Sequence, residues 1–486
     1  MQQHGDRLGP LDAAFLHVET PTRHMHVGAL VVLDRPDGSE PVTVDRLRRL
    51  VASRLHVFPR FRQRVLMPPG GVSAPVWIDD AGFDLTRHVV SAAAPTPGTT
   101  AELHALADHL FSQPLDRRRP LWEFHVVEGL ADGRAAVVAK THHAMVDGAS
   151  GIEVGALLFD PTVDGSADLP SPEPWQPRPA PTEQELVGAG LEELVRRPLE
   201  DVGRRLRDTS PTAVAGQVAQ LGQGLASFLR QGLAGRVSRT LINQEPGPDR
   251  RLAVAQVGLD ELRHLKSVFE VTVNDVLLAA VGDTIGRYLR HRGESTRGRT
   301  LRAVIPVSTR RVDEGEELGN RVANVFVDLP IDELDPVERL RRCGRQMDRA
   351  KSEHAADAAD TMLGLTRYAP PALQALGARL VVNGHLYNII ITNVPGPQLP
   401  LWCLGARVLA AYPLVPLAAA QSLAVGAVSL DGRVNVGFTA DRAALPDADV
   451  LGGMLLQSLE ELRRSAEAEA ERRARSHRHP DSEALP

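Results

Sequence analysis

One short stretch constrains this chain more than any other. It occupies residues 140–151 and reads KTHHAMVDGASG. The apolar run 135–139 precedes it and small residues follow it, an order that predicts a strand, a tight turn and a helix. Because successive side chains of a strand alternate between its two sides, His142 and His143 should point in opposite directions. One imidazole can then face a cavity while the other packs behind it.

Two residues of the predicted turn add to this pattern. Asp147 can orient the histidines or pair with an arginine elsewhere, and Gly148 lets the backbone approach closely or adopt a positive φ. The alternative is a pair of histidines that pack at a strand end and carry no chemistry. The segment 120–130 predicts a neighbouring strand, joined to the histidine strand by a turn at Asp132 and Gly133. This hairpin would place Trp122 beside the histidines as a core residue.

Other kinds of site fit the sequence poorly. A serine hydrolase needs the nucleophile elbow GxSxG, but residues 148–152 read GASGI and lack the last glycine. The nucleotide-binding pattern GxxxxGK followed by Ser or Thr does not occur. Adjacent strand histidines diverge and do not easily share one ion, and His24 and His26 have no third ligand nearby. We expect those two at the surface or lining a cavity, and we predict no metal site.

Composition limits the partners and the compartment. A formal net charge of −6 argues against general affinity for nucleic acid. The two cysteines, Cys343 and Cys403, are far apart, which is typical of a reducing compartment. Residues 1–10 are polar and lack the apolar core of a secretory signal. These features predict a cytoplasmic protein.

The chain divides into four parts by pattern. With 486 residues it is long enough for two to three domain-sized cores. We predict an N-terminal lobe over 1–160, a Pro-rich linker and helical connector over 161–248, a C-terminal lobe over 249–465 and a disordered charged tail over 466–486. The connector carries two amphipathic helices within 182–233, the first of them rich in arginine. A basic amphipathic helix can lie on an anionic membrane surface, or the helices can pack on the two lobes.

An uncharged stretch over 408–430 could be mistaken for a membrane span. It is long enough to cross a bilayer. However, Pro413, Pro416 and Gly426 break it into short pieces, so we predict two buried strands there. In the second half, Asn274 sits in the first turn of a predicted helix. It can cap that helix or present a polar group at the mouth of a site.

Several short motifs occur together in one order. They are LGPLD at 8–12, PLW at 120–122, HHxxxDG at 142–148, ND at 274–275, PVSTR at 306–310, GN at 319–320 and NVPGP at 393–397. In this order they resemble the bacterial wax ester synthase/diacylglycerol acyltransferase family, over roughly residues 8–462. The HHxxxDG motif alone resembles the wider superfamily of CoA-dependent acyltransferases. The resemblance implies an α/β fold of two chloramphenicol-acetyltransferase-like lobes joined by a helical crossover, with the active-site tunnel between them.

The resemblance also implies a reaction and roles for residues. The expected activity moves a fatty acyl group from acyl-CoA to diacylglycerol or to a long-chain alcohol, without an acyl-enzyme. His143 would be the general base, His142 would pack behind it, and Asp147 would be architectural. The expected substrates are acyl-CoA and a hydroxyl lipid, with no cofactor beyond the co-substrate acyl-CoA, and a membrane or lipid-droplet surface is a further expected contact.

Supporting residues follow from what the reaction needs. A tetrahedral oxyanion requires aimed hydrogen-bond donors, for which Asn274 is the first candidate and Ser308 and Thr392 are weaker ones. Arg310 is a candidate partner of Asp147. Two alternatives stay open: an acyltransferase of the same superfamily that esterifies a polyketide or other specialised alcohol, and a non-catalytic relative that binds lipid.

Overall fold

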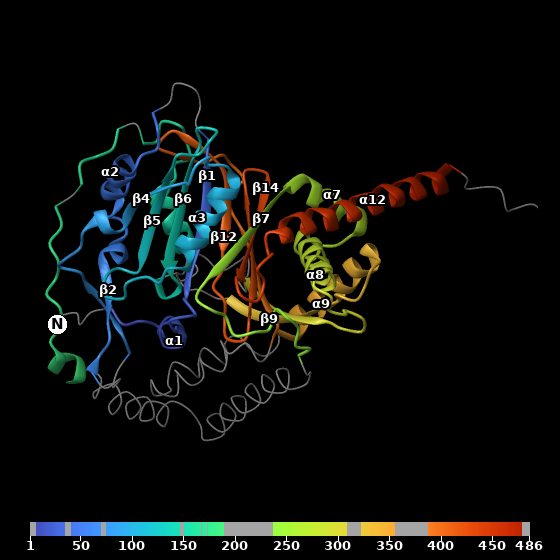
Figure 1. Cartoon of the computed structure of the whole chain (residues 1–486), viewed down its shortest axis with the longest axis horizontal. Helices are drawn as coiled ribbons and strands as arrows, with labels where there is room; N and C mark the ends of the chain where they lie inside the picture. Colours follow the sequence, from blue (N-terminus) through green and yellow to red (C-terminus); the bar gives the residue numbers. More distant parts are fainter. Residues whose placement is uncertain are drawn as a thin grey trace, which may run out of the picture.

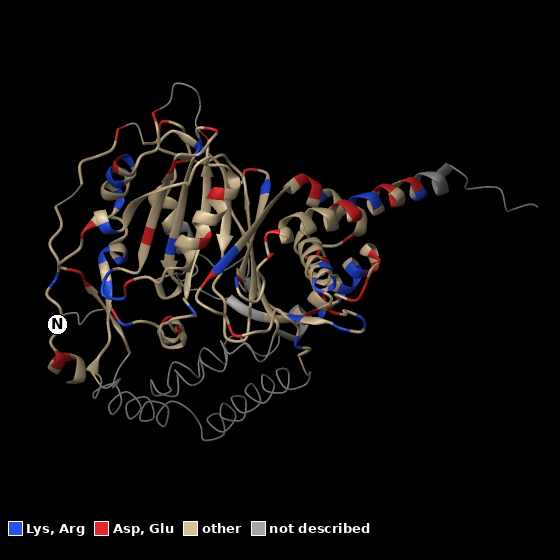
Figure 2. Cartoon of the chain, in the orientation of Figure 1, with Lys and Arg blue, Asp and Glu red and all other residues tan. Residues whose placement is uncertain are grey.

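Two mixed β-sheets, each with its own helices, make up the molecule (Figure 1). The structure is a computed structural model that describes residues 6–34, 40–69, 74–145, 150–166, 168–172, 174–188, 237–308, 322–354 and 387–478. Charged side chains concentrate on the outer helices and loops, while the sheets are mostly uncharged (Figure 2). The predicted α/β class with two lobes is confirmed.

The first sheet has the strand order β11-β12-β1-β6-β5-β4. Its strands are β1 (His26–Leu33), β4 (Val89–Ala93), β5 (Trp122–Glu128), β6 (Ala135–His142), β11 (Trp402–Cys403) and β12 (Ala406–Leu414). The β5–β6 pair is the predicted antiparallel hairpin, with Trp122 opposite Thr141. Every residue of β6 is buried, because β1 and β5 flank it and helices cover both faces.

Helices and short segments surround this sheet. They are α1 (Pro10–Val18), α2 (Val44–Arg54), α3 (Thr100–Ser112), α4 (Ser150–Leu158), the 3₁₀ turns η1 (Pro59–Arg62), η3 (Leu85–Arg87) and η4 (His143–Met145), and the pair β2 (Gln63–Leu66) and β3 (Val76–Asp79). The α2 helix forms as its pattern predicts: Thr43 caps its start, and Leu47, Leu50 and Val51 bury one face.

The second sheet has the order β7-β14-β13-β10-β8-β9. Its strands are β7 (Arg250–Gly258), β8 (Leu301–Ser308), β9 (Val322–Leu329), β10 (Ile389–Pro395), β13 (Leu423–Leu430) and β14 (Arg433–Asp441). The helices α7 (Leu259–Phe269), α8 (Val273–His291), α9 (Pro336–His354) and α12 (Val450–Arg478) gather on one side of it (Figure 1). Their apolar faces and the sheet share one large core.

Within the described residues, two of the contacts between the lobes involve whole strands or helices. The first is β12, which lies late in the chain but pairs with β1 of the first sheet. It also crosses β14 so closely that a Cβ at Gly437 would lie 2.0 Å from the Pro413 carbonyl oxygen. In the second contact, α3 meets β7, the edge strand of the second sheet. The Leu252 N–H donates to Asp108 Oδ1 at 2.7 Å, and the Arg250 N–H donates to Ser112 Oγ at 2.8 Å.

The stretch 408–430 forms two strands, as predicted, but only β13 is mostly buried, while β12 is partly buried. It forms most of β12 and all of β13, with Pro413 near the end of β12. Among the described residues, no helix combines the length and hydropathy needed to cross a membrane. The predicted connector helices of 182–233 lie mostly outside the described residues. The four predicted domain boundaries stay predictions.

The end of the chain differs from the prediction. The α12 helix continues to Arg478, so the disorder expected from residue 466 is wrong for residues 466–478. Alanines and closely spaced ion pairs such as Arg472–Glu469, at 3.0 Å, favour helix there. In Figure 1 this part of α12 projects away from the body of the molecule.

Candidate active site

The two histidines lie where the central strand of the first sheet ends. His142 is the last residue of β6, and His143 opens the 3₁₀ turn η4. The rings have different neighbours, as the alternation along a strand predicts. His143 stacks on Phe15 of α1, with ring centroids 3.9 Å apart and planes inclined by 16°. His142 instead faces Glu19, the residue that follows α1.

His142 is almost completely buried, with 1% of its surface exposed. Its Nδ1 accepts a hydrogen bond from the Ala144 backbone N–H at 3.0 Å. Because a backbone N–H can only donate, Nδ1 carries no proton and the neutral ring holds its proton on Nε2. That Nε2 lies 3.6 Å from Glu19 Oε1, which is an electrostatic contact beyond hydrogen-bond length.

His143 is only half-buried, so part of its surface stays accessible. Its backbone N–H donates to the Met25 carbonyl at 2.7 Å. Burial lowers the pKa of the His143 imidazole to about 4, against a smaller opposing effect of its own backbone carbonyl. The ring is therefore neutral at pH 7 and has a lone pair that can accept a proton.

Further ionisable groups are buried beside the pair, and sequence reasoning missed most of them. Lys140, also on β6, donates to the carbonyls of Leu110 and Gln113 at 3.1 and 3.0 Å and lies 3.1 Å from Glu123. Burial would raise the pKa of Glu19, but His142 and Arg117 outweigh it and hold that pKa at about 2. A lysine inside an otherwise apolar strand was the available sequence signal.

His24 and His26 are buried against α3, not at the surface as one expectation had it. Their rings stack 5.4 Å apart, and His26 Nε2 lies 2.7 Å from the Phe111 carbonyl oxygen. Burial lowers the pKa of both imidazoles. Among the described residues, no three or more His, Cys, Asp and Glu side chains are grouped so as to hold a metal ion.

Asn274 does not cap its helix. The cap of α8 is Thr272, which forms a capping box with Asp275, so the capping interpretation of Asn274 is wrong. Asn274 Oδ1 instead accepts a hydrogen bond from Asn393 Nδ2 of β10 at 3.4 Å. Since Thr392 precedes Asn393 in the same strand, its side chain lies on the opposite face of the sheet. The structure therefore does not bring Asn274 and Thr392 together.

The remaining candidates have simpler outcomes. Trp122 is fully buried and donates from Nε1 to the Phe61 carbonyl at 2.8 Å, as a core residue does. Ser308 is the last residue of β8, but its side chain lies outside the described part of the chain. Asp147, Gly148 and Arg310 also lie outside the described residues, so the predicted pairing of Asp147 with Arg310 stays a prediction.

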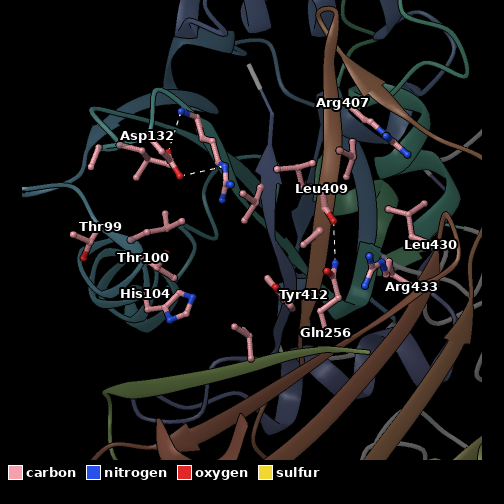
Figure 3. Close-up of a pocket in the computed structure, with 18 of the residues that line it drawn as sticks. Thr99, Thr100, His104, Asp132, Gln256, Arg407, Leu409, Tyr412, Leu430 and Arg433 are labelled. Atoms are coloured by element: carbon pink, nitrogen blue, oxygen red, sulfur yellow. Dashed lines mark hydrogen bonds and ion pairs between the residues drawn. The ribbon is translucent and has the colours of Figure 1, made fainter. Parts of the chain in front are cut away.

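A cavity of about 680 Å³ lies between the lobes, away from His142 and His143. Figure 3 shows the residues that line it. The start of α3, the β5–β6 and β13–β14 hairpins, β7 and β12 line it. Val32 is part of the lining, and in the sheet register it pairs with Ala136 near the start of β6. The histidines are at the other end of that strand, so this cavity is not their site. The tunnel between the lobes stays a prediction.

Comparison with known proteins places the chain in a family. Residues 8–277 match the sequence model of the wax ester synthase/diacylglycerol acyltransferase catalytic domain, and residues 318–463 match the C-terminal domain of the same family. A probable diacylglycerol O-acyltransferase of Mycobacterium tuberculosis is 33% identical over 460 residues, which cover 94% of each chain. A putative diacylglycerol O-acyltransferase of the same species is 31% identical over 476 residues, covering 94% of this chain and 90% of the relative.

Solved structures agree with this assignment. A wax ester synthase/diacylglycerol acyltransferase from Marinobacter aquaeolei superimposes with a TM-score of 0.69 at 25% identity, covering 95% of this chain and all of the other. A trichothecene 15-O-acetyltransferase from Fusarium sporotrichioides has a TM-score of 0.60 at 13% identity, covering 94% of each chain, and so shows a shared fold alone. The chain therefore belongs to the wax ester synthase/diacylglycerol acyltransferase family and is an acyltransferase that acts on lipid.

Proposed function

We propose that the chain transfers a fatty acyl group from acyl-CoA to the hydroxyl of diacylglycerol or of a long-chain alcohol, with His143 as the general base. The observation that carries this proposal is the neutral, half-buried imidazole at the end of β6. Family membership supports the acyl donor and the lipid acceptor. The mycobacterial relatives are named as diacylglycerol O-acyltransferases, which favours diacylglycerol as the first acceptor to test.

The chemistry is a direct transfer. His143 takes the proton of the attacking hydroxyl while the new C–O bond forms at the thioester carbon. The tetrahedral intermediate then breaks its C–S bond, and the imidazolium returns the proton to the departing thiolate. An imidazolium with a low pKa gives up this proton readily, because an ordinary thiol has a pKa near ~8.5. The thioester is already activated, so we expect neither an acyl-enzyme nor a cofactor besides acyl-CoA.

The oxyanion of the tetrahedral intermediate also needs a hydrogen-bond donor that is aimed at it. Asn274 remains our first candidate, because Asn393 holds its Oδ1 and its side-chain amide is the kind of group that can donate to an oxyanion. Ser308 and Thr392 remain weaker candidates. We also propose that the protein works at the surface of a membrane or lipid droplet, where a hydroxyl lipid is accessible to it.

Release of CoA from palmitoyl-CoA tests this function. Wild type and His143→Ala are run side by side with hexadecanol and with dipalmitoylglycerol, and the lipid products are identified by chromatography. We expect acceptor-dependent release that the variant loses, with the faster acceptor naming the preferred class. Release that survives in His143→Ala would contradict the role of His143. If wild type releases no CoA with either acceptor, these acceptors are wrong, and a specialised alcohol becomes the better assignment.

A further inference from the structure

Glu19 lies at a point where several contacts of the histidine pair meet. It directly follows α1 and precedes β1, and its side chain is 12% exposed. The family motifs quoted above do not include it. Its carboxylate contacts groups from three segments: His142 at the end of β6, Met25 beside the start of β1, and Arg117 after α3.

Two of these contacts lead to the backbone around His143. Glu19 Oε1 accepts a hydrogen bond from the Met25 N–H at 3.1 Å, and the Met25 carbonyl accepts the His143 N–H at 2.7 Å. The same oxygen lies 3.6 Å from His142 Nε2, while His142 Nδ1 accepts the Ala144 N–H at 3.0 Å. The peptide N–H groups on both sides of the His143 Cα are thus held by groups that Glu19 orients.

The third contact leads to the ring of His143. Arg117 donates from Nε to Glu19 Oε2 at 2.7 Å and from a terminal nitrogen to the Leu16 carbonyl at 2.8 Å. Both contacts hold the C-terminal end of α1. That helix carries Phe15, on which the His143 imidazole stacks. Glu19 therefore connects to His143 through its backbone and through its aromatic neighbour.

Charge explains why this position needs a carboxylate. The His142 ring must keep its proton on Nε2 so that Nδ1 can accept the Ala144 N–H. An anion facing Nε2 stabilises that tautomer and fixes the ring plane. A glutamine would keep the shape but would present either a weaker acceptor or an N–H group toward Nε2.

We propose that Glu19 is a positioning residue of the acyl transfer, which holds the ring of His142, with its proton on Nε2, and the backbone of His143 in the geometry needed for proton abstraction. The inference rests on the role of His143 proposed above. Glu19 does not touch the reacting atoms. Its removal should therefore lower kcat and leave the KM values for acyl-CoA and acceptor nearly unchanged.

Three variants test this role by steady-state CoA release. Glu19→Ala should lower kcat ~100-fold, the size of effect expected for a small misplacement of a catalytic group, and Glu19→Gln ~10-fold. Glu123→Gln is the matched control. Glu123 is also a partly buried acid of the first sheet with a histidine and a lysine as partners, His125 and Lys140, and does not contact the histidine pair. It should retain kcat within about 2-fold.

A readout independent of activity separates positioning from general damage. In protein labelled with ¹⁵N-histidine, the His142 signals, identified with a His142→Gln variant, should report the Nε2–H tautomer in wild type. Glu19→Gln should shift them towards a mixture of tautomers, whereas Glu123→Gln should leave them unchanged. Thermal melts establish that each variant is folded, and Glu19→Gln serves where Glu19→Ala does not fold.

The outcomes decide the proposal. A folded Glu19→Ala with kcat within about 2-fold of wild type would overturn it, as would an equal loss in Glu123→Gln or an unchanged His142 tautomer. His143→Ala is assayed in parallel. If His143→Ala is inactive while the Glu19 variants are fully active, only the present inference fails. If His143→Ala stays active, the proposed function fails first.

Discussion

Two inner strands, β6 of the first sheet and β13 of the second, bury different kinds of residue. In the first sheet, β6 buries Lys140 and His142 along with its apolar residues, and both take part in polar contacts. In the second sheet, β13 runs from Leu423 to Leu430 without an ionisable residue and packs into the large apolar core. Burying ionisable groups costs free energy unless they are paired. The first sheet accepts that cost at the end of β6, where His143, the proposed general base, begins the next turn.

The comparison suggests a division of labour. In the mechanism proposed above, the N-terminal lobe supplies the proton acceptor and the charges that hold it. The C-terminal lobe supplies neutral amides, Asn274 and Asn393, from the start of α8 and the end of β10. Neutral donors suit an oxyanion that exists only transiently, because they need no counter-charge before the reaction starts.

The largest loss of kcat should come from a substitution in the N-terminal lobe. His143→Ala removes the base, and we expect kcat to fall by ~10³-fold or more. Loss of one imidazole from a half-buried position should leave the fold intact, which a thermal melt and acyl-CoA binding can verify. A folded variant with more than a tenth of wild-type activity would argue against base catalysis by this residue.

The second largest loss of kcat should come from a substitution in the C-terminal lobe. Asn274→Ala should lower kcat ~10²-fold if its amide stabilises the oxyanion. Asn393→Ala should cost only ~10-fold, because Asn393 orients Asn274 and does not itself donate to the intermediate. Steady-state rates with one acceptor measure both. Equal effects, or a larger effect for Asn393, would reverse the roles of the two amides.

A stability measurement tests what the buried charges of the first sheet cost. Lys140→Met leaves Glu123 without its buried cation and should lower the free energy of unfolding by ~3 kcal/mol. The double variant Lys140→Met with Glu123→Gln removes both charges and should recover part of that loss. Urea denaturation of the three proteins measures this. If the double variant is less stable than Lys140→Met, the buried pair is not the source of the cost.

The stability that Asp108 contributes at the contact between the lobes should depend on pH. Burial raises the pKa of Asp108 to about 7, while its hydrogen bond from the Leu252 N–H and the charge of Arg251 oppose this. The folded state thus binds a proton that the unfolded state releases near pH 4, so the contribution of Asp108 is complete below that pH and is lost as pH rises through 7.

The variant Asp108→Asn isolates this small pH dependence of the stability. Asp108→Asn should lack this part of the pH dependence, so its urea midpoint relative to wild type should increase between pH 5 and pH 8. The midpoints of both proteins are measured at each pH. A constant difference across that range would show that Asp108 titrates equally in the folded and unfolded states.

Local pattern was enough to predict much of the fold. The alternation and turn residues of 120–142 predicted the β5–β6 hairpin, and the prolines of 408–430 predicted two strands. The pairing of β12 with β1 could not be predicted that way, because it joins Leu33 to Val408 across most of the chain. The length of α12 was missed because a charged, alanine-rich tail suits both disorder and a solvated helix.

The candidate site shows the same limit. The residues His142 and His143 followed from a motif, because their chemistry and spacing are local. Glu19 did not, since its importance depends on three segments that meet only in the folded protein. The pairing of Asn274 with Asn393 was missed for the same reason, although each residue lies in a motif that the sequence analysis quoted.

The central claim is that a half-buried, neutral His143 accepts the proton of the acceptor hydroxyl. The pH dependence of kcat/KM for the acceptor tests it most directly, with each sample returned to pH 7 to verify that activity is recovered. Since burial lowers the pKa of His143 to about 4, activity should stay level from pH 8 to pH 5 and fall by half near pH 4 as the imidazole gains a proton. A reversible loss of half the activity at about pH 6.5, the ordinary pKa of a solvated histidine, would contradict this claim.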